Sequence, residues 1–205
     1  GLLVRVRNAL ERERRFTADA AHELRTPLAA LKVHAQNAVR AQTPDERQAS
    51  LEHMLAGLER TIHLAEQMLA LSRASASGDA AQTSVPLRKL VAETIENLRP
   101  RIRERALRVD IRCEPKDSDI EVRGDRQKLG SLVSNLLDNA VRYSAPGSRI
   151  DVALFRTKNE ASLTVTDQGP GIPEDLRERV FESYYRIPGV AASGSGLGLA
   201  IVKEV

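Results

Sequence analysis

His22 is the side chain in this sequence whose neighbours are best suited to chemistry on a helix surface. It stands in the stretch Ala-His-Glu-Leu-Arg-Thr-Pro-Leu at 21–28, where apolar or small residues recur in steps of three, four and seven. With these residues at the a and d positions of a heptad, His22 falls on the flank of the helix, and Thr26 follows one turn later on the same flank. Pro27 crowds the carbonyl of Glu23, so we expect the helix to bend or loosen there. The pattern indicates surface chemistry, or a histidine that is simply solvated.

A second polar set shares one face of a helix expected at 125–143. Asn135 and Asn139 are four residues apart, and Arg142 lies one turn beyond them. Neutral amide oxygens suit a magnesium ion that keeps its waters and takes its negative charge from phosphates. Arg142 could contact those phosphates. The alternative is a pair of ordinary surface asparagines.

Two glycine clusters follow. Asp167 ends an alternating strand, and its carboxylate, which only accepts hydrogen bonds, could read the exocyclic amine of adenine. Gly169 and Gly171 permit close approach of a flat ligand, although taken alone they are better explained by a Gly-Pro turn after a strand. Further along, glycines run into an apolar helix start whose N–H groups favour phosphate. This last cluster comprises Gly194, Gly196 and Gly198, and it matches neither a Walker A nor a Rossmann motif.

A helical hairpin must carry His22. The first helix is expected over 4–41, and Thr43, Pro44 and Glu46 then form the capping box of a second helix. Apolar residues of this second helix follow in steps of four and three at Leu51, Leu55, Leu58, Ile62, Ala65 and Leu69. Because two helices cannot bury both apolar seams, we expect a homodimeric four-helix bundle. Docking of the hairpin on the chain's own second domain is the alternative.

The pattern becomes mixed α/β after a small, polar linker. Helices are expected over 87–104 and 125–143, and strands over 108–113, 120–123, 150–155 and 163–166. These strands are compatible with antiparallel pairing and form no βαβ series. We therefore divide the chain into a dimerisation and phosphotransfer domain at 1–73, a linker at 74–84 and an α/β domain at 85–205.

Composition narrows the function classes. The 205 residues carry a formal net charge of +3 from dispersed arginines and only 3% aromatic residues, which argues against a nucleic-acid partner. Cys113 is the only cysteine, so an intrachain disulfide is impossible, a cysteine-based zinc site is not expected, and a reducing compartment fits. The sequence contains no apolar run of 18 residues and no signal-peptide pattern. Both ends look cut from a longer protein.

Taken together and in this order, the motifs resemble those of bacterial sensor histidine kinases. The segment around His22 is similar to the phosphoacceptor H box, 135–143 to the N box, 167–173 to the G1 box, 179–186 to the F box and 194–198 to the G2 box. The segment at 16–20 and the box spacing look most like the quorum-sensing and polymyxin-resistance sensor kinases of Gram-negative bacteria. The resemblance implies a dimeric helical bundle followed by an α/β two-layer sandwich of the Bergerat (GHKL) ATP-binding type, truncated at its C-terminus.

The resemblance also implies a reaction and its residues. His22 would attack the γ-phosphate of ATP, Glu23 would orient the imidazole and accept its other proton, and Thr26 would position water to dephosphorylate a partner response regulator. Asn139 would be the main Mg²⁺ ligand with support from Asn135. Asp167 would bind the adenine amine, Tyr143 would pack on the base, and Arg142 and Arg186 would stabilise phosphate charge; 187–195 would be the ATP lid.

Two departures from related ATPases matter. Gyrase and heat-shock chaperones carry a glutamate where Asn135 stands, and its absence argues against an ATPase that activates water. The family's ATP domain also continues beyond the G2 box. The expected whole protein is a dimer, anchored in the bacterial inner membrane with this part in the cytoplasm, that phosphorylates a response regulator aspartate. The alternative is an inactive dimeric scaffold that docks the regulator.

Overall fold

The computed structural model describes residues 2–75, 82–114, 120–158, 160–189 and 194–205. The chain divides into two compact units, residues 1–69 and 70–205. Within the described residues, no helix has the length and apolar character needed to cross a membrane.

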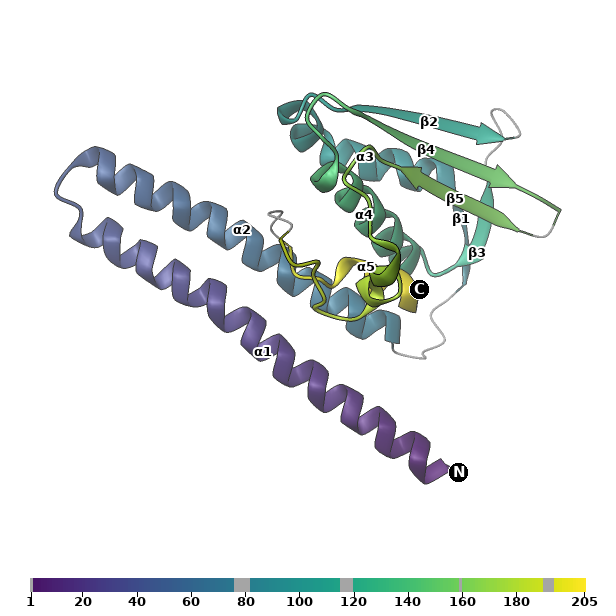
Figure 1. Ribbon diagram of the computed structural model, residues 1–205, viewed down its shortest axis with the longest axis horizontal. Helices are drawn as coiled ribbons and strands as arrows, with labels where there is room; N and C mark the ends of the chain where they lie inside the picture. Colours follow the sequence, from purple (N-terminus) through teal and green to yellow (C-terminus); the bar gives the residue numbers. More distant parts are fainter. Residues whose placement is uncertain (1, 76–81, 115–119, 159, 190–193) are drawn as a thin grey trace. The chain divides into compact units, whose positions relative to one another are not determined.

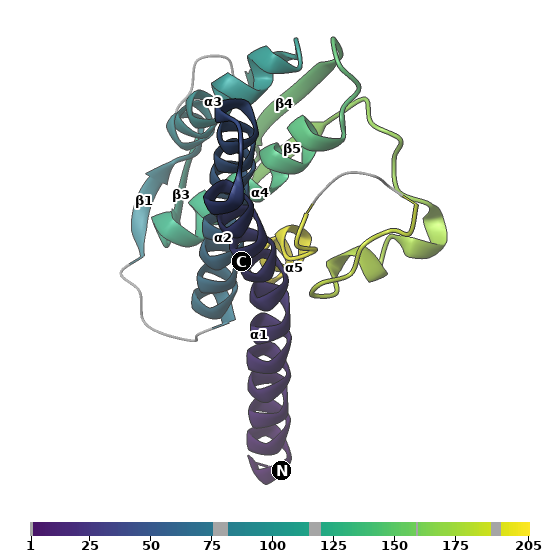
Figure 2. The same cartoon turned by 90° about the vertical axis from the view of Figure 1, so that its left-hand side faces the viewer.

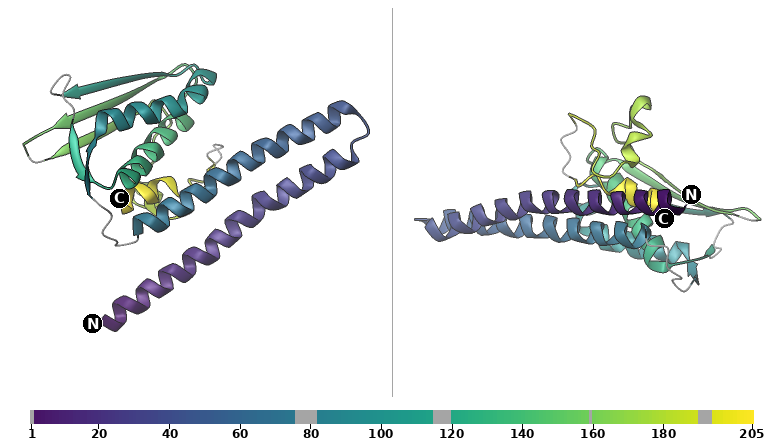
Figure 3. Two further views of the ribbon diagram at one scale, coloured as in Figure 1. Left: turned by 180° about the vertical axis from the view of Figure 1, so that it is seen from behind. Right: turned by 90° about the horizontal axis from the view of Figure 1, so that it is seen from below.

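The first unit is built on an antiparallel helical hairpin (Figures 1 and 3). Helix α1 spans Leu2–Arg40 and continues through Pro27, and helix α2 spans Pro44–Ser75. The amide of Glu46 donates to Oγ1 of Thr43 at 3.2 Å, and Oε2 of Glu46 accepts from the amide of Thr43 at 3.3 Å. This reciprocal pair is the predicted capping box, so the start of α2 is confirmed.

The two helices of the hairpin contact each other through small and aromatic side chains. A Cβ on Gly57 would lie 3.0 Å from Cδ2 of Leu31, so the missing side chain lets the helices approach closely. The rings of His34 and His53 stack with their centroids 5.3 Å apart. The apolar seam of α2, in contrast, is largely exposed, at Leu51, Leu55, Leu58, Ile62 and Leu69.

The second unit packs two helices on one face of a three-stranded sheet (Figures 1 and 2). Its helices are α3 (Leu87–Glu104), α4 (Arg126–Tyr143) and the short α5 (Gly198–Glu204), with 3₁₀ turns at Glu174–Leu176 and Arg179–Phe181. The strands of this sheet, in spatial order, are β2 (Arg108–Glu114), β4 (Arg149–Arg156) and β5 (Ala161–Thr166). A separate two-stranded sheet joins β1 (Thr83–Pro86) to β3 (Glu121–Gly124).

Strand pairing differs from the antiparallel pattern that the sequence suggested. Strand β4 pairs antiparallel with β5 but parallel with β2. The reason lies in the connection, because the segment between β2 and β4 contains helix α4, and a helical crossover returns the chain in the same direction. The expected linker also begins and ends in regular structure: Ala74 and Ser75 continue α2, Thr83 and Ser84 belong to β1, and 76–81 lie outside the described residues.

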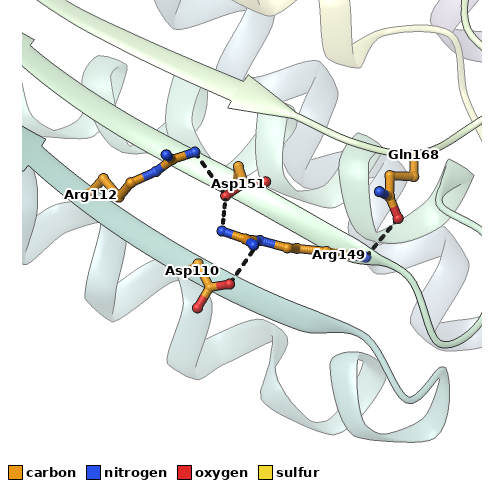
Figure 4. A network of polar contacts seen from close by, with 5 residues as sticks. All are labelled: Asp110, Arg112, Arg149, Asp151 and Gln168. Atoms are coloured by element: carbon orange, nitrogen blue, oxygen red, sulfur yellow. Dashed lines mark hydrogen bonds and ion pairs between the residues drawn. The ribbon is translucent and has the colours of Figure 1, made fainter.

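The alternation along β4 separates the two faces of the sheet. Ile150, Val152 and Leu154 are fully buried against α3 and α4. The intervening residues point to the other face, where Arg149 binds Asp110 at 2.9 Å and Asp151 at 2.7 Å (Figure 4). Exposed ion pairs of this kind contribute little to stability, so the buried face holds the unit together.

Candidate functional site

Helix α4 is the element that collects the candidate nucleotide-binding residues. Its N-terminus is capped by Asp125, whose Oδ1 accepts from the amides of Gln127 at 2.7 Å and Lys128 at 3.4 Å. One face of the helix is buried in the core through Val133, Leu137, Ala140 and Val141. With this face fixed, the polar residues of the helix are held in a defined direction.

The N-box asparagines lie beside the last glycine of the G2 box. A Cβ on Gly198 would lie 3.0 Å from Oδ1 of Asn135 and 3.6 Å from Nδ2 of Asn139. Asn135 is buried, and its Nδ2 donates to the carbonyl of Ser131 at 2.8 Å. The two amides that the helical spacing placed on one face therefore meet at a glycine that leaves room for them.

Arg142 extends this row along α4 towards the first glycine of the G2 box. A Cβ on Gly194 would lie 2.5 Å from Nη1 of Arg142, and Nη2 donates to Oδ2 of Asp138 at 2.8 Å. The N box and the G2 box, about sixty residues apart in the sequence, thus run side by side.

The middle glycine of the G2 box is fixed against the F box. Gly196 has φ +74°, and a Cβ there would lie 2.6–2.9 Å from backbone atoms of Tyr184 and Tyr185. The amide of Tyr184 donates to the carbonyl of Gly196 at 3.0 Å, and Tyr184 itself has φ +65°. The positive φ and the close backbone contact explain why this position holds glycine.

The G1 box adjoins the C-terminal end of α4. The amide of Gly169 donates to Oδ1 of Asp167 at 2.8 Å, which orients the exposed carboxylate. A Cβ on Gly169 would lie 2.9 Å from the carbonyl oxygen of Tyr143, the last residue of α4. Gly171 has φ +74° and open space around it.

The donors of the N box fit a hard divalent cation. Among the described residues no group of three or more His, Cys, Asp or Glu could hold a metal ion. The side-chain Nδ2 of Asn135 donates to a backbone carbonyl of its own helix, so the side-chain Oδ1 faces Gly198. Two carboxamide oxygens suit Mg²⁺ that takes its remaining ligands from water and phosphate.

The phosphoacceptor candidates lie apart from this group in sequence, on α1 of the first unit. His22, Glu23 and Thr26 are all exposed, as the heptad register predicted for His22 and Thr26. Arg186 is exposed in the F-box segment of the second unit. Residues 190–193 of the expected ATP lid lie outside the described residues.

Two further residues contribute to this region and were not singled out from the sequence. Oε1 of Gln168 accepts from the amide of Arg149 at 3.2 Å, which ties the residue after Asp167 to the start of β4 (Figure 4). Asp138 is buried and binds Arg142. The opposite charges at i and i+4 on α4 were a signal for this pair; no pattern pointed to Gln168.

Comparison with known families finds a match in each unit. Residues 12–77 match the model described as His Kinase A (phospho-acceptor) domain, and residues 124–205 match that of the Histidine kinase-, DNA gyrase B-, and HSP90-like ATPase. Sensor protein QseC of Salmonella typhi and sensor protein kinase PmrB of Pseudomonas aeruginosa are each 38% identical to this chain over 100% of its length. The chain spans 44% and 42% of those two proteins, which is less than half of each.

A solved structure agrees with the sequence relatives. The mycobacterial sensor histidine kinase MprB is 37% identical, with a TM-score of 0.53, over 60% of this chain and 77% of that structure. The predicted helical hairpin followed by an α/β ATPase fold is confirmed. This chain belongs to the sensor histidine kinase family, as the order of its motifs predicted.

Proposed function

We propose that this chain is the catalytic part of a sensor histidine kinase that transfers the γ-phosphoryl group of ATP to His22. One observation carries the proposal: α4 holds Asn135, Asn139 and Arg142 alongside the G2 glycines, in a chain whose α1 presents an exposed histidine. A row of amide and guanidinium groups beside a glycine-rich backbone is suited to a polyphosphate and its cation.

Each N-box and G-box residue has a proposed part in holding the nucleotide. The carboxylate of Asp167, oriented by the amide of Gly169, accepts from the adenine amine. Tyr143 packs on the base, and Arg142 and Arg186 stabilise phosphate charge. The remaining glycines allow the nucleotide to approach the backbone, and they are Gly171, Gly194, Gly196 and Gly198.

Magnesium is the cation that we propose for this site. Asn139 holds it with support from Asn135. When bound, the ion neutralises phosphate charge and orients the transferring group. The amides contribute no negative charge, so the affinity of the site for the ion depends on the phosphates of ATP.

The transfer itself is a displacement at the γ-phosphorus. A ring nitrogen of His22 forms the new P–N bond as the bond to the β,γ-bridging oxygen breaks, and ADP leaves. Glu23 orients the imidazole and accepts the proton from its other nitrogen, which adjacency on an exposed helix surface permits. Positioning and charge neutralisation supply most of the catalysis in such a reaction.

We propose that the chain acts as a homodimer. The exposed row of leucine and isoleucine side chains on α2 and the exposed Leu28 on α1 supply an apolar seam for a second hairpin. The partner that receives the phosphoryl group is an aspartate of a response regulator. The whole protein is anchored in the bacterial inner membrane through a segment preceding this part, which lies in the cytoplasm.

The test is incubation of the full-length protein with γ-labelled ATP and Mg²⁺. The wild type is expected to gain label that is acid-labile and base-stable. His22→Ala should remove all label, whereas His34→Gln, a change at another histidine of α1, should retain it. Label that persists in His22→Ala would reject His22 as acceptor. An unlabelled wild type would favour the alternative, an inactive dimeric scaffold that docks the regulator.

Thr26 supports a second activity, dephosphorylation of the regulator. Its exposed hydroxyl lies one turn beyond His22, where it can position a water molecule. Thr26→Ala is expected to slow loss of phosphate from the regulator by about a hundredfold, because the water loses its alignment. Thr26→Ser should restore the rate, and labelling of His22 should be unchanged in both variants. The activity would be excluded if Thr26→Ala dephosphorylated the regulator at the wild-type rate.

A further inference from the structure

Asp138 is a buried carboxylate that joins two helices at the nucleotide site. Its side chain is only 7% exposed, and each of its oxygens accepts from a different arginine. Oδ1 binds Nη1 of Arg101 on α3, and Oδ2 binds Nη2 of Arg142 on α4 at 2.8 Å. A carboxylate so little exposed must be paired, because an uncompensated buried charge is costly.

The two arginines differ in their surroundings. The side chain of Arg101 on α3 is 42% exposed, whereas that of Arg142 on α4 is 20% exposed. The second terminal nitrogen of Arg142, Nη1, lies beside Gly194 of the G2 box. Asp138 therefore binds one end of the guanidinium group of Arg142. The other end lies beside the G2 box, where we propose that the phosphates of ATP bind.

We propose that Asp138 is a positioning residue for nucleotide binding, which fixes the guanidinium of Arg142 in the orientation that contacts the phosphates of ATP. This inference rests on the proposed function, and it adds a residue that acts through Arg142. Arg101 fixes the carboxylate from α3, and the carboxylate in turn fixes Arg142. An arginine whose guanidinium is already held by a carboxylate has less rotational freedom to lose on binding a phosphate.

A purely structural role for Asp138 makes a different prediction. If the carboxylate only joined α3 to α4, its loss would disturb every part of the nucleotide equally. If it acts through Arg142, its loss should weaken the phosphate contacts and spare the base. The comparison of Mg-ATP with adenosine, which has no phosphate, separates these roles.

The experiment measures dissociation constants of the full-length protein for Mg-ATP and adenosine by calorimetry. Asp138→Asn, which keeps the shape and removes the charge, is expected to weaken Mg-ATP binding about tenfold or more, since a charge-assisted hydrogen bond is lost. Adenosine binding should stay within about twofold, because the contacts of Asp167 remain. In an Arg142→Met background, Asp138→Asn should cause no further loss, because the residue through which it acts is gone.

Asp151 provides the matched control. Its Oδ1 also binds two arginines, Arg112 at 3.1 Å and Arg149 at 2.7 Å, but on the outer face of the sheet (Figure 4). Asp151→Asn should leave Mg-ATP binding unchanged. If Asp138→Asn does not fold, Asp138→Glu replaces it: this variant keeps the charge but shifts the carboxylate relative to Arg142, so the same selective loss is expected.

Three results would overturn the inference. They are an unchanged affinity for Mg-ATP in Asp138→Asn, equal losses for Mg-ATP and adenosine, and additive losses in the double variant. In each of these cases the wild type still binds Mg-ATP, so the proposed function stands. A wild type that does not bind Mg-ATP would overturn both.

Discussion

Gly196→Ala is expected to abolish nucleotide binding, with a dissociation constant for Mg-ATP raised more than a hundredfold. The added Cβ would lie 2.6 Å from the carbonyl carbon of Tyr184 and 2.8 Å from the carbonyl oxygen of Tyr185. Both are backbone atoms, which cannot rotate away as the end of a side chain can. The left-handed φ of +74° adds about 1–2 kcal/mol for any residue with a Cβ. The G2 segment must therefore move, and with it the glycines beside Asn135 and Arg142.

Gly147→Ala is the control for this substitution. Gly147 also has a left-handed φ, +80°, but a Cβ there would meet nothing within 4 Å. Gly147→Ala should lower the free energy of unfolding by about 1–2 kcal/mol and leave the affinity for Mg-ATP nearly unchanged. Isothermal titration of both variants, with urea unfolding in parallel, makes the comparison. Equal losses of affinity in the two variants would contradict the explanation by backbone overlap.

Leu154→Ala is expected to lower the free energy of unfolding of the second unit by about 3 kcal/mol or more. Leu154 lies on the central strand β4, fully buried against α3 and α4. Truncation removes apolar contacts and leaves a cavity, and both terms destabilise the native state. Because stabilities of single domains are only about 5–15 kcal/mol, this is a large fraction of the total.

The next residue along β4 provides an unusual control. Phe155 points to the opposite face of the sheet and is 38% exposed. Phe155→Ala removes more atoms than Leu154→Ala, yet we expect it to cost about 1 kcal/mol or less. Urea unfolding followed by circular dichroism gives both values. A larger loss for Phe155→Ala than for Leu154→Ala would show that the assigned register of β4 is wrong.

The parts of the fold that depend on local sequence were predictable. The helix expected over 87–104 has those bounds, and the second helix of the hairpin starts at Pro44, as its capping box required. Such signals act within a few residues: a cap, a proline at the first turn, a repeated apolar step. The alternation of 150–155 likewise located β4 to within one residue at each end.

The parts of the fold that depend on distant residues were not predictable from the sequence. Parallel pairing of β2 with β4 and the short β1, which pairs with β3, follow from how the chain returns on itself, and neither leaves a local pattern. Tyr184 adopts a left-handed φ because its backbone binds Gly196, and no propensity predicts that for tyrosine. The i, i+4 spacing of Asp138 and Arg142 was a local signal, but the second partner of Asp138, Arg101, comes from another helix and left none.

The parallel pairing of β2 with β4 has a consequence for the kinetics of folding. Each pair in this register joins residues about forty positions apart, whereas the hairpin of α1 and α2 forms around a turn of three residues, 41–43. Loop closure must precede any gain from distant pairing, so structures rich in local contacts form in microseconds to milliseconds and those rich in distant pairings more slowly. We therefore expect the hairpin that carries His22 to form early. The nucleotide site is expected to form only after the strands of the central sheet have paired.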